Sequence, residues 1–250
     1  MRHFLSFSKM VFFFLILLYG CTGSSLKNYE IGVDPSWYPL NFQGRDPMVL
    51  GFSTELLQKV TEEEHLTLSL LSTNWDTLFS GLKEQKYQAI LSSLYPYTFY
   101  QDQYDFSELY LAIGPVLLVK TSSLAKDLHD LQEKEVGILE GSTHALLLEK
   151  DPSILIRTFT SPPELLNALV QEQVDAALLP ILLAEAYLQD LYQGKIHIIS
   201  EPLTKEGLRL IALKGKAGEL IHAFNQTLSS MQKTKEYEKL LAKWQLGPSL

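Results

Sequence analysis

The amino-acid sequence predicts an α/β protein built as two lobes, each a mixed sheet flanked by helices. Three observations support this prediction. Short strand signals and amphipathic helix signals alternate along the chain, which is the pattern of α/β folds. One helix–strand unit occurs twice in closely similar form. Roughly 230 of the 250 residues follow an N-terminal export signal, and this length exceeds the common domain size of about 100 to 150 residues.

The first 20 residues have the composition of an export signal peptide. Arg2 and Lys9 provide a basic start, and residues 11–18 form an uninterrupted apolar run. This run is too short to cross a bilayer as a helix of the mature chain. We therefore predict that residues 1–20 are a signal peptide and that the mature chain works outside the cytoplasm.

The end of the signal, residues 18–21, resembles the lipobox of bacterial lipoproteins. The resemblance implies that the thiol of Cys21 is acylated and that Cys21 becomes the first mature residue, with residues 21–27 as a lipidated polar tether. The alternative is an ordinary thiol left after conventional cleavage. Cys21 is the only cysteine in the sequence, which excludes an intrachain disulfide even in an oxidising compartment.

The mature chain is acidic. Without the signal peptide it has 19 basic and 29 acidic residues, a net charge of −10. Such a surface repels polyanions, so we expect neither nucleic acid nor anionic lipid headgroups as binding partners.

The first half of the mature chain alternates strands and helices. Residues 29–34 and 66–70 are predicted strands, and between them Ser53 is a candidate N-cap for a helix with apolar positions at 56, 57 and 60. Asn74 is a candidate N-cap for a second helix, whose apolar residues recur at 75, 78, 79 and 82. Residues 87–94 then read as a buried strand.

A second copy of this last unit follows in the middle of the chain. Ser161 is its candidate N-cap, Pro162 takes the first helical position and Glu164 completes a capping box. Two lobes of like construction explain the repeat, and chance similarity is the alternative. The alignment of residues 87–91 with 174–178 places Leu78 on Leu165, Phe79 on Leu166, Leu82 on Leu169 and Ala89 on Ala176.

Two apolar strands, at residues 115–120 and 208–213, are candidates to carry the chain from one lobe to the other and back. Two crossing strands form a hinge, and a cleft between hinged lobes is a common ligand site. We predict lobe 1 at residues 27–117 and 209–250 and lobe 2 at 118–208. Residues 220–246 are predicted to form two amphipathic helices.

Motifs for catalysis or metal binding are missing from the sequence. The six histidines have no spacing typical of zinc ligands, and no nucleophile elbow, P-loop or dinucleotide fingerprint occurs. We therefore predict no metal and no cofactor. His144 beside residues 141–143 is the one histidine near a presumed cleft, although a solvated histidine at a helix start is the simpler interpretation.

The mature chain resembles the periplasmic amino-acid-binding proteins of ABC importers, the family 3 solute-binding proteins with the type II two-lobed fold. The resemblance implies a small-molecule ligand bound between the lobes, an ABC permease as partner and no enzymatic activity. It spans nearly the whole mature chain and is carried by residues 32–42, 51–56, 75–76, 104–107, 141–143, 174–177 and 237–244.

Two positions depart from the family pattern. An arginine five residues before the aspartate of the D-F-S motif binds the ligand carboxylate in the family, and counting back from Asp105 gives Tyr100. An acidic residue five positions after the second-lobe D-A strand binds the ligand ammonium, and counting from Asp175 gives Pro180. The residues that bind the carboxylate and the ammonium group of an amino acid in the family are therefore both missing at these positions.

The remaining positions predict a cleft lined by aromatic rings and carboxylates. Such a cleft suits a cationic or apolar ligand. The backbone N–H groups after Glu140 open a predicted helix and are candidates to hold an oxygen of the ligand. The alternative for Tyr95, Tyr97 and Phe99 is period-2 strand packing, with the rings facing the core of their own lobe. The predicted ligand-binding residues are Asp34, Trp37, Trp75, Ser93, Tyr95, Tyr97, Tyr100, Glu140, Gly141, Ser142 and Thr143.

Three functions fit these features. The first is a monomeric binding protein, anchored to the membrane through the lipid on Cys21, that delivers a solute to an ABC permease. The second is an enzyme on the same fold, similar to the dehydratases of the family, with Glu140 and His144 as its only candidate groups. The third is a sensor subunit for a partner protein. We expect the first, with a periplasmic location.

Overall fold

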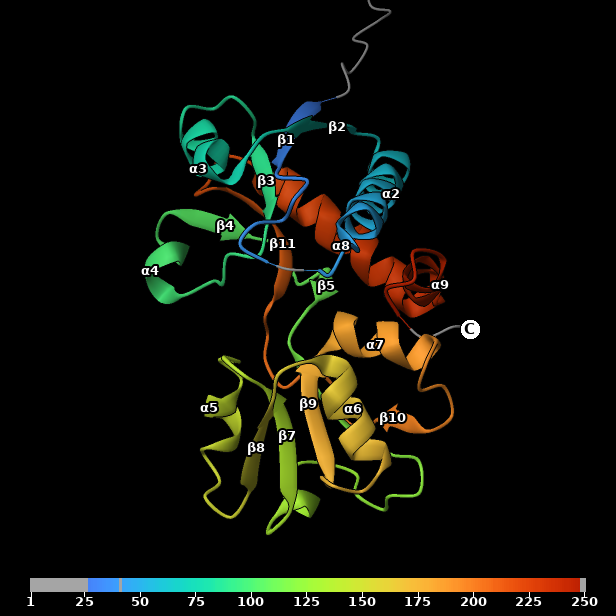
Figure 1. Cartoon of the computed structure of the whole chain (residues 1–250). Coiled ribbons are helices and arrows are strands. Elements are labelled where there is room, and N and C mark those ends of the chain that lie inside the picture. Colours follow the sequence, from blue (N-terminus) through green and yellow to red (C-terminus); the bar gives the residue numbers. More distant parts are fainter. Residues whose placement is uncertain (1–26, 41, 248–250) are drawn as a thin grey trace, which may run out of the picture.

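The computed structural model describes residues 27–40 and 42–247, and these form two bodies, one above the other in Figure 1. The predicted signal peptide and Cys21 lie outside the described residues. Each body contains one sheet with helices against it, so the predicted α/β class and its two sheets are confirmed. Within the described ranges, no helix is both long and apolar enough to cross a membrane.

The first lobe is built on a sheet with the strand order β2-β1-β3-β11-β4, and a short strand, β5, also pairs with β11. β1 runs parallel to β2 and β3, while β11 runs antiparallel to β3, β4 and β5. The strands are β1 (Asn28–Val33), β2 (Thr67–Ser72), β3 (Ala89–Ser92), β4 (Tyr104–Phe106), β5 (Leu111–Ala112) and β11 (Gly207–Leu213).

Helices cover both faces of this sheet. Successive side chains of β11 point to opposite faces of the sheet. Leu208, Leu210 and Ala212 belong to the buried cluster on one face, and Ile211 belongs to the cluster on the other. The first cluster packs under α2 (Asp46–Glu64), α8 (Gly218–Thr234) and α9 (Glu236–Lys243). The second packs under α3 (Trp75–Lys83), near the short helix α4 (Thr98–Gln101).

The second lobe is built on a sheet with the strand order β10-β6-β9-β7-β8. β6 runs antiparallel to β9 and β10, whereas β7 runs parallel to β8 and β9. The strands are β6 (Pro115–Lys120), β7 (Glu135–Leu139), β8 (Leu155–Phe159), β9 (Ala176–Pro180) and β10 (Ile196–Ile198), and the helices are η1 (His129–Leu131), α5 (Ala145–Leu148), α6 (Pro162–Val170) and α7 (Ile181–Gln189).

The predicted duplication is confirmed. α3 leads into β3 as α6 leads into β9, and each strand then pairs with an antiparallel neighbour, β11 or β6. Gln85 and Glu172, at corresponding positions after the two helices, both adopt a left-handed backbone with φ of 57° and 59°. The next amide bonds back to the helix over 2.9 and 2.8 Å, from Lys86 to Gly81 and from Gln173 to Ala168.

Two of the three predicted helix caps are confirmed. The side chain of Asn74 accepts a bond from the amide of Thr77, and that of Ser161 accepts one from the amide of Glu164. The Glu164 carboxylate accepts from the amide of Thr160, one residue before the cap. The Ser53 cap was wrong, because α2 begins seven residues earlier and Ser53 lies inside it, where its hydroxyl donates to the carbonyl of Val49.

The chain crosses between the lobes just before β6 and just before β11. These two segments run beside each other, because the amide of Ile113 donates to the carbonyl of Glu206 and that of Leu203 to the carbonyl of Pro115, over 3.1 and 2.8 Å. Sheet pairing places β6 in the second sheet from Pro115 and β11 in the first from Gly207. The lobe boundaries at 117/118 and 208/209 remain a prediction.

A candidate ligand cavity between the lobes

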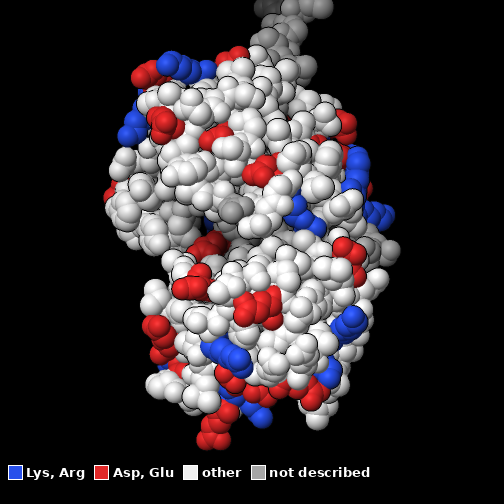
Figure 2. Space-filling view, in the orientation of Figure 1, with Lys and Arg blue, Asp and Glu red and all other residues white. Residues whose placement is uncertain are grey.

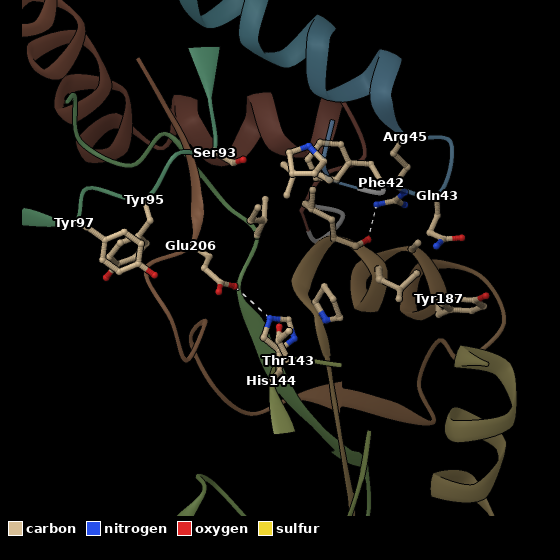
Figure 3. Close-up of a pocket in the computed structure, with 17 residues that line it drawn as sticks. Phe42, Gln43, Arg45, Ser93, Tyr95, Tyr97, Thr143, His144, Tyr187 and Glu206 are labelled. Atoms are coloured by element: carbon tan, nitrogen blue, oxygen red, sulfur yellow. Dashed lines mark hydrogen bonds and ion pairs between the residues drawn. The ribbon is translucent and has the colours of Figure 1, made fainter. Parts of the chain in front are cut away.

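A cavity of about 680 Å³ lies between the two lobes, within the size range of about 300 to 1,000 Å³ that is usual for small-molecule sites. Figure 2 shows the hollow between the lobes, with acidic side chains close to its edge. Both lobes and the crossing segments contribute to it (Figure 3). Its lining residues are Pro39, Leu40, Phe42, Gln43, Arg45, Ser93, Tyr95, Tyr97, Ile113, Thr143, His144, Pro180, Leu182, Leu183, Ala186, Tyr187 and Glu206.

The loop after β1 forms one part of the first-lobe wall. Asp34 is nearly buried, and its carboxylate accepts from the amide and the hydroxyl of Ser36 over 2.9 and 2.7 Å. This bonding starts a turn in which Trp37 adopts a left-handed backbone with φ of 55°. The Trp37 side chain is 4% exposed and packs in the first-lobe core. Pro39, Leu40, Phe42, Gln43 and Arg45, which follow the turn, line the cavity.

Aromatic side chains after β3 form the other part of this wall. Tyr95 and Tyr97 have ring centroids 4.8 Å apart, and Tyr97 stacks on Phe99 at 5.7 Å with nearly parallel planes. Residues 93–97 are not part of a strand, so the period-2 interpretation of these rings was wrong. Tyr97 and Phe99 are more than half exposed, which leaves an aromatic strip at the edge of the cavity.

The second-lobe wall comes from the start of α5 and from α7. Thr143 and His144 precede α5, and Pro180 ends β9 immediately before α7. A ring nitrogen of His144 lies 3.2 Å from a carboxylate oxygen of Glu206, as the dashed line in Figure 3 shows. This contact joins the second lobe to the crossing segment, and half of the Glu206 side chain remains accessible to a ligand.

Arg45 connects the first lobe to α7. One guanidinium nitrogen donates to the carbonyl of Leu182 over 3.0 Å. Burial lowers the pKa of Arg45 and the charge of Glu185 opposes this shift, while burial raises the pKa of Glu185 and Arg45 opposes it. A guanidinium remains protonated in proteins. Of the described residues, Arg45 is the one arginine or lysine that lines the cavity.

The structure brings four of the predicted site residues to this cavity, Ser93, Tyr95, Tyr97 and Thr143. Asp34, Trp37 and Trp75 instead meet Ser93 at a second, very small cavity of about 10 Å³. Tyr100 lines neither cavity and packs beside Phe99 and Tyr104, with centroids 4.2 and 6.4 Å away. Glu140, Gly141 and Ser142 also line neither, and Glu140 and Gly141 are exposed. The binding roles of all eleven remain predictions.

Sequence reasoning missed Phe42, Arg45, Tyr187 and Glu206. Arg45 carried one signal, because it follows the loop that had been assigned to the cleft and is the nearest arginine to it in the sequence. Glu206 and Tyr187 carried none, since they reach the cavity only through the crossing segment and the orientation of α7.

Comparisons with known proteins give the family. The curated relatives include the arginine-binding extracellular protein ArtP of Bacillus subtilis, 26% identical over 90% of this chain and 88% of its own length. The L-cystine-binding protein TcyJ of Escherichia coli is 25% identical over 86% of this chain and 81% of its own. The histidine-binding periplasmic protein of Escherichia coli is 25% identical over 87% of this chain and 87% of its own length. All three relatives are named as binding proteins, which agrees with the expectation that this chain is not an enzyme.

The fold matches solved two-lobed structures. The unliganded, open L-cystine solute receptor of Neisseria gonorrhoeae matches with a TM-score of 0.69 at 20% identity, over 87% of this chain and 92% of its own. The second substrate-binding domain of GlnP from Lactococcus lactis matches with a TM-score of 0.64 at 19% identity, over 87% and 95%. Residues 29–247 match the family described as bacterial extracellular solute-binding proteins, family 3. The chain belongs to this family of solute-binding proteins, which serve ABC importers.

Proposed function

We propose that this chain is a lipid-anchored binding protein that captures an amino acid or a related small solute in the cavity between its lobes and delivers it to an ABC permease. The observation that carries the proposal is the cavity of about 680 Å³ lined by both lobes and by the hydrogen-bonded crossing segments. A ligand there contacts both lobes at once, so binding favours the conformation in which they are close.

The lining favours a ligand with a cationic group. The carboxylate of Glu206 and the rings of Tyr95, Tyr97 and Tyr187 face the cavity, and both kinds of group attract cations. The relatives named above bind arginine, histidine and L-cystine, and two of these carry basic side chains. A basic amino acid or a related amine therefore fits the cavity best.

The membrane anchor in this proposal rests on the sequence alone. Growth of cells with labelled palmitate is the direct test, because acylation at Cys21 attaches the label covalently. The wild-type chain should carry the label and Cys21→Ala should carry none, since the sequence has no second cysteine. Label in the variant, or none in the wild type, contradicts the anchor.

The ligand proposal is tested by a thermal-shift screen of the full-length chain in detergent. The panel contains the common amino acids, short peptides, polyamines and quaternary amines. A ligand present at a hundred times its dissociation constant stabilises the folded state by about 2.7 kcal/mol, which is a readily measured shift. Stabilisation by basic amino acids or amines supports the proposal, and a flat response to the whole panel contradicts it.

A further inference from the structure

Arg209 on β11 is a buried cation with unsatisfied hydrogen-bonding capacity. Its side chain is 6% exposed, and one terminal guanidinium nitrogen, Nη1, is fully buried without a hydrogen-bond partner. The other, Nη2, donates to the carbonyl of Lys205 over 3.2 Å. Across residues 27–40 and 42–247, no carboxylate lies within 4.0 Å of this guanidinium.

A buried charge without a counter-ion is costly, and native structures rarely keep one without a reason. Burial lowers the pKa of Arg209, and Tyr95 and Glu108 oppose that shift, but a guanidinium stays protonated across the physiological range. The charge is therefore present, and the described chain supplies no ion pair for it. An anion from outside the chain is the partner that would complete the site.

Arg209 lies beside the wall of the interlobe cavity. It pairs across the sheet with Ser92, and the next residue, Ser93, lines the cavity. Its Nη2 donates to the carbonyl of Lys205, and the next residue, Glu206, lines the cavity. Tyr95, which opposes the lowering of the Arg209 pKa, also lines the cavity, and its hydroxyl has no hydrogen bond to any described residue.

The other arginine at the cavity is already engaged. Arg45 donates to the carbonyl of Leu182 and lies near the buried carboxyl of Glu185, so its charge has both a hydrogen-bond acceptor and a compensating group. Arg209 has an acceptor for one of its two terminal nitrogens only. Arg209, and not Arg45, is therefore the arginine that lacks a compensating anion.

We propose that Arg209 determines specificity by binding the carboxylate of the ligand. This carboxylate enters between Tyr95 and Ser93 and accepts a hydrogen bond from the unpaired Nη1 of the guanidinium. This inference rests on the proposed function and narrows it to solutes with a carboxylate at one end and a cationic group at the other. The cationic group then lies toward Glu206 and the tyrosine rings. Tyr95 lines the cavity at the proposed entry, and its hydroxyl has no hydrogen bond to a described residue that a movement of the ring would break.

Pairs of probes that differ only by the carboxylate isolate this interaction. We choose L-arginine with agmatine, L-lysine with cadaverine and L-histidine with histamine, and measure their affinities by calorimetry on the full-length chain in detergent. The wild type should prefer the amino acid of at least one pair by about 100-fold, the effect expected for losing one partner of a buried charge pair. Arg209→Gln should reduce this preference to about twofold or less.

Two further variants make the result specific. Arg209→Lys keeps the charge without the planar fork and should give an intermediate preference. Arg157→Gln removes an exposed arginine on β8 of the second lobe and should leave the preference at the wild-type value. If Arg209 were only structural, Arg209→Met would lower the unfolding temperature without ligand. We expect that temperature to be unchanged or higher, because the variant removes an unpaired buried charge.

The outcomes separate the two proposals. A wild-type preference that survives in folded Arg209→Gln overturns the role of Arg209 and leaves the proposed function intact. A wild type that binds the amines as tightly as the amino acids also overturns it, since no carboxylate is then recognised. If the thermal-shift panel as a whole gives no response, the proposed function fails together with the inference.

Discussion

Glu185 on α7 is a buried acid at the contact between the lobes. It is 8% exposed, and burial raises its pKa above the ordinary value, with Arg45 opposing the shift. A carboxyl whose folded-state pKa is raised contributes stability at a pH below its ordinary value, near 4.5. That contribution is lost as the pH rises through the raised value. Above the raised pKa, the stability that the protonated carboxyl contributes is therefore absent.

Glu185→Gln mimics the protonated form and should keep this stability at all pH values. We expect the variant to be more stable than the wild type at pH 7 and to have about the same stability at pH 4, measured by urea denaturation at each pH. Glu63→Gln, on the exposed face of α2, is the control and should change stability little at either pH. A variant less stable than the wild type at pH 7 would show that the charge of Glu185 stabilises the contact with Arg45.

Substitutions of Glu206 and Glu140 distinguish the cavity seen in the structure from the site predicted from the sequence. Glu206 lines the cavity, and Glu140, one of the two carboxylates that sequence reasoning chose, is exposed outside it. Glu206→Gln should weaken binding of a basic amino acid by about 1.5 to 3 kcal/mol, the contribution of a hydrogen bond to a charged group. Glu140→Gln should have little effect. Calorimetry with the best ligand of the screen decides, and the opposite ranking would place the site at Glu140.

At the scale of elements, α9 is held against α2 by a small set of contacts. The carboxylate of Glu55 accepts from the ammonium of Lys243 over 2.6 Å and from the indole N–H of Trp244 over 2.9 Å. The indole ring lies directly over Gly51, and a Cβ built there would be 2.2 Å from the ring. A residue without a side chain is therefore required at position 51.

Gly51→Ala should destabilise the first lobe by about 1 to 3 kcal/mol, because the added methyl group forces Trp244 away from α2. Gly218→Ala is the matched control, since a Cβ there meets nothing within 4 Å and the residue is the first of α8. The control should be neutral or stabilise by up to about 1 kcal/mol. Urea denaturation measures both, and equal stabilities for the two variants would refute the packing account.

Elements with strong local signals were predicted well from the sequence. The helix after Ser161 was found because a cap, a proline and a glutamate occur together within four residues, and these act locally. The start of α2 was missed because Ser53, a good cap by itself, lies within a longer apolar pattern that begins at Pro47 and Met48. The cavity side chains of α7 were missed because only the placement of one lobe on the other brings them there.

At the scale of the whole molecule, the two sheets keep their own cores and meet through few connections. The crossing segments are in close contact, since a Cβ on Gly114 would lie 2.5 Å from the hydroxyl oxygen of Thr204. α7 is the bridge on the other side, where Leu182 packs into the first-lobe core and Arg45 holds its carbonyl. In the proposed function, a change in the distance between the lobes would therefore act on these two contacts.

The distance between the lobes tests the central claim, that a solute bound in the interlobe cavity draws the lobes together. α4 and α5 lie on the same side of the molecule, one on each lobe (Figure 1), and Gln101 and Glu149 at their ends are exposed. Spin labels at Gln101→Cys and Glu149→Cys, with Cys21→Ala to remove the native thiol, report this distance by pulsed electron resonance. We predict a shorter, narrower distance distribution when the best ligand of the screen is added at saturation. The same distribution with and without a ligand that calorimetry shows to be bound would contradict the account.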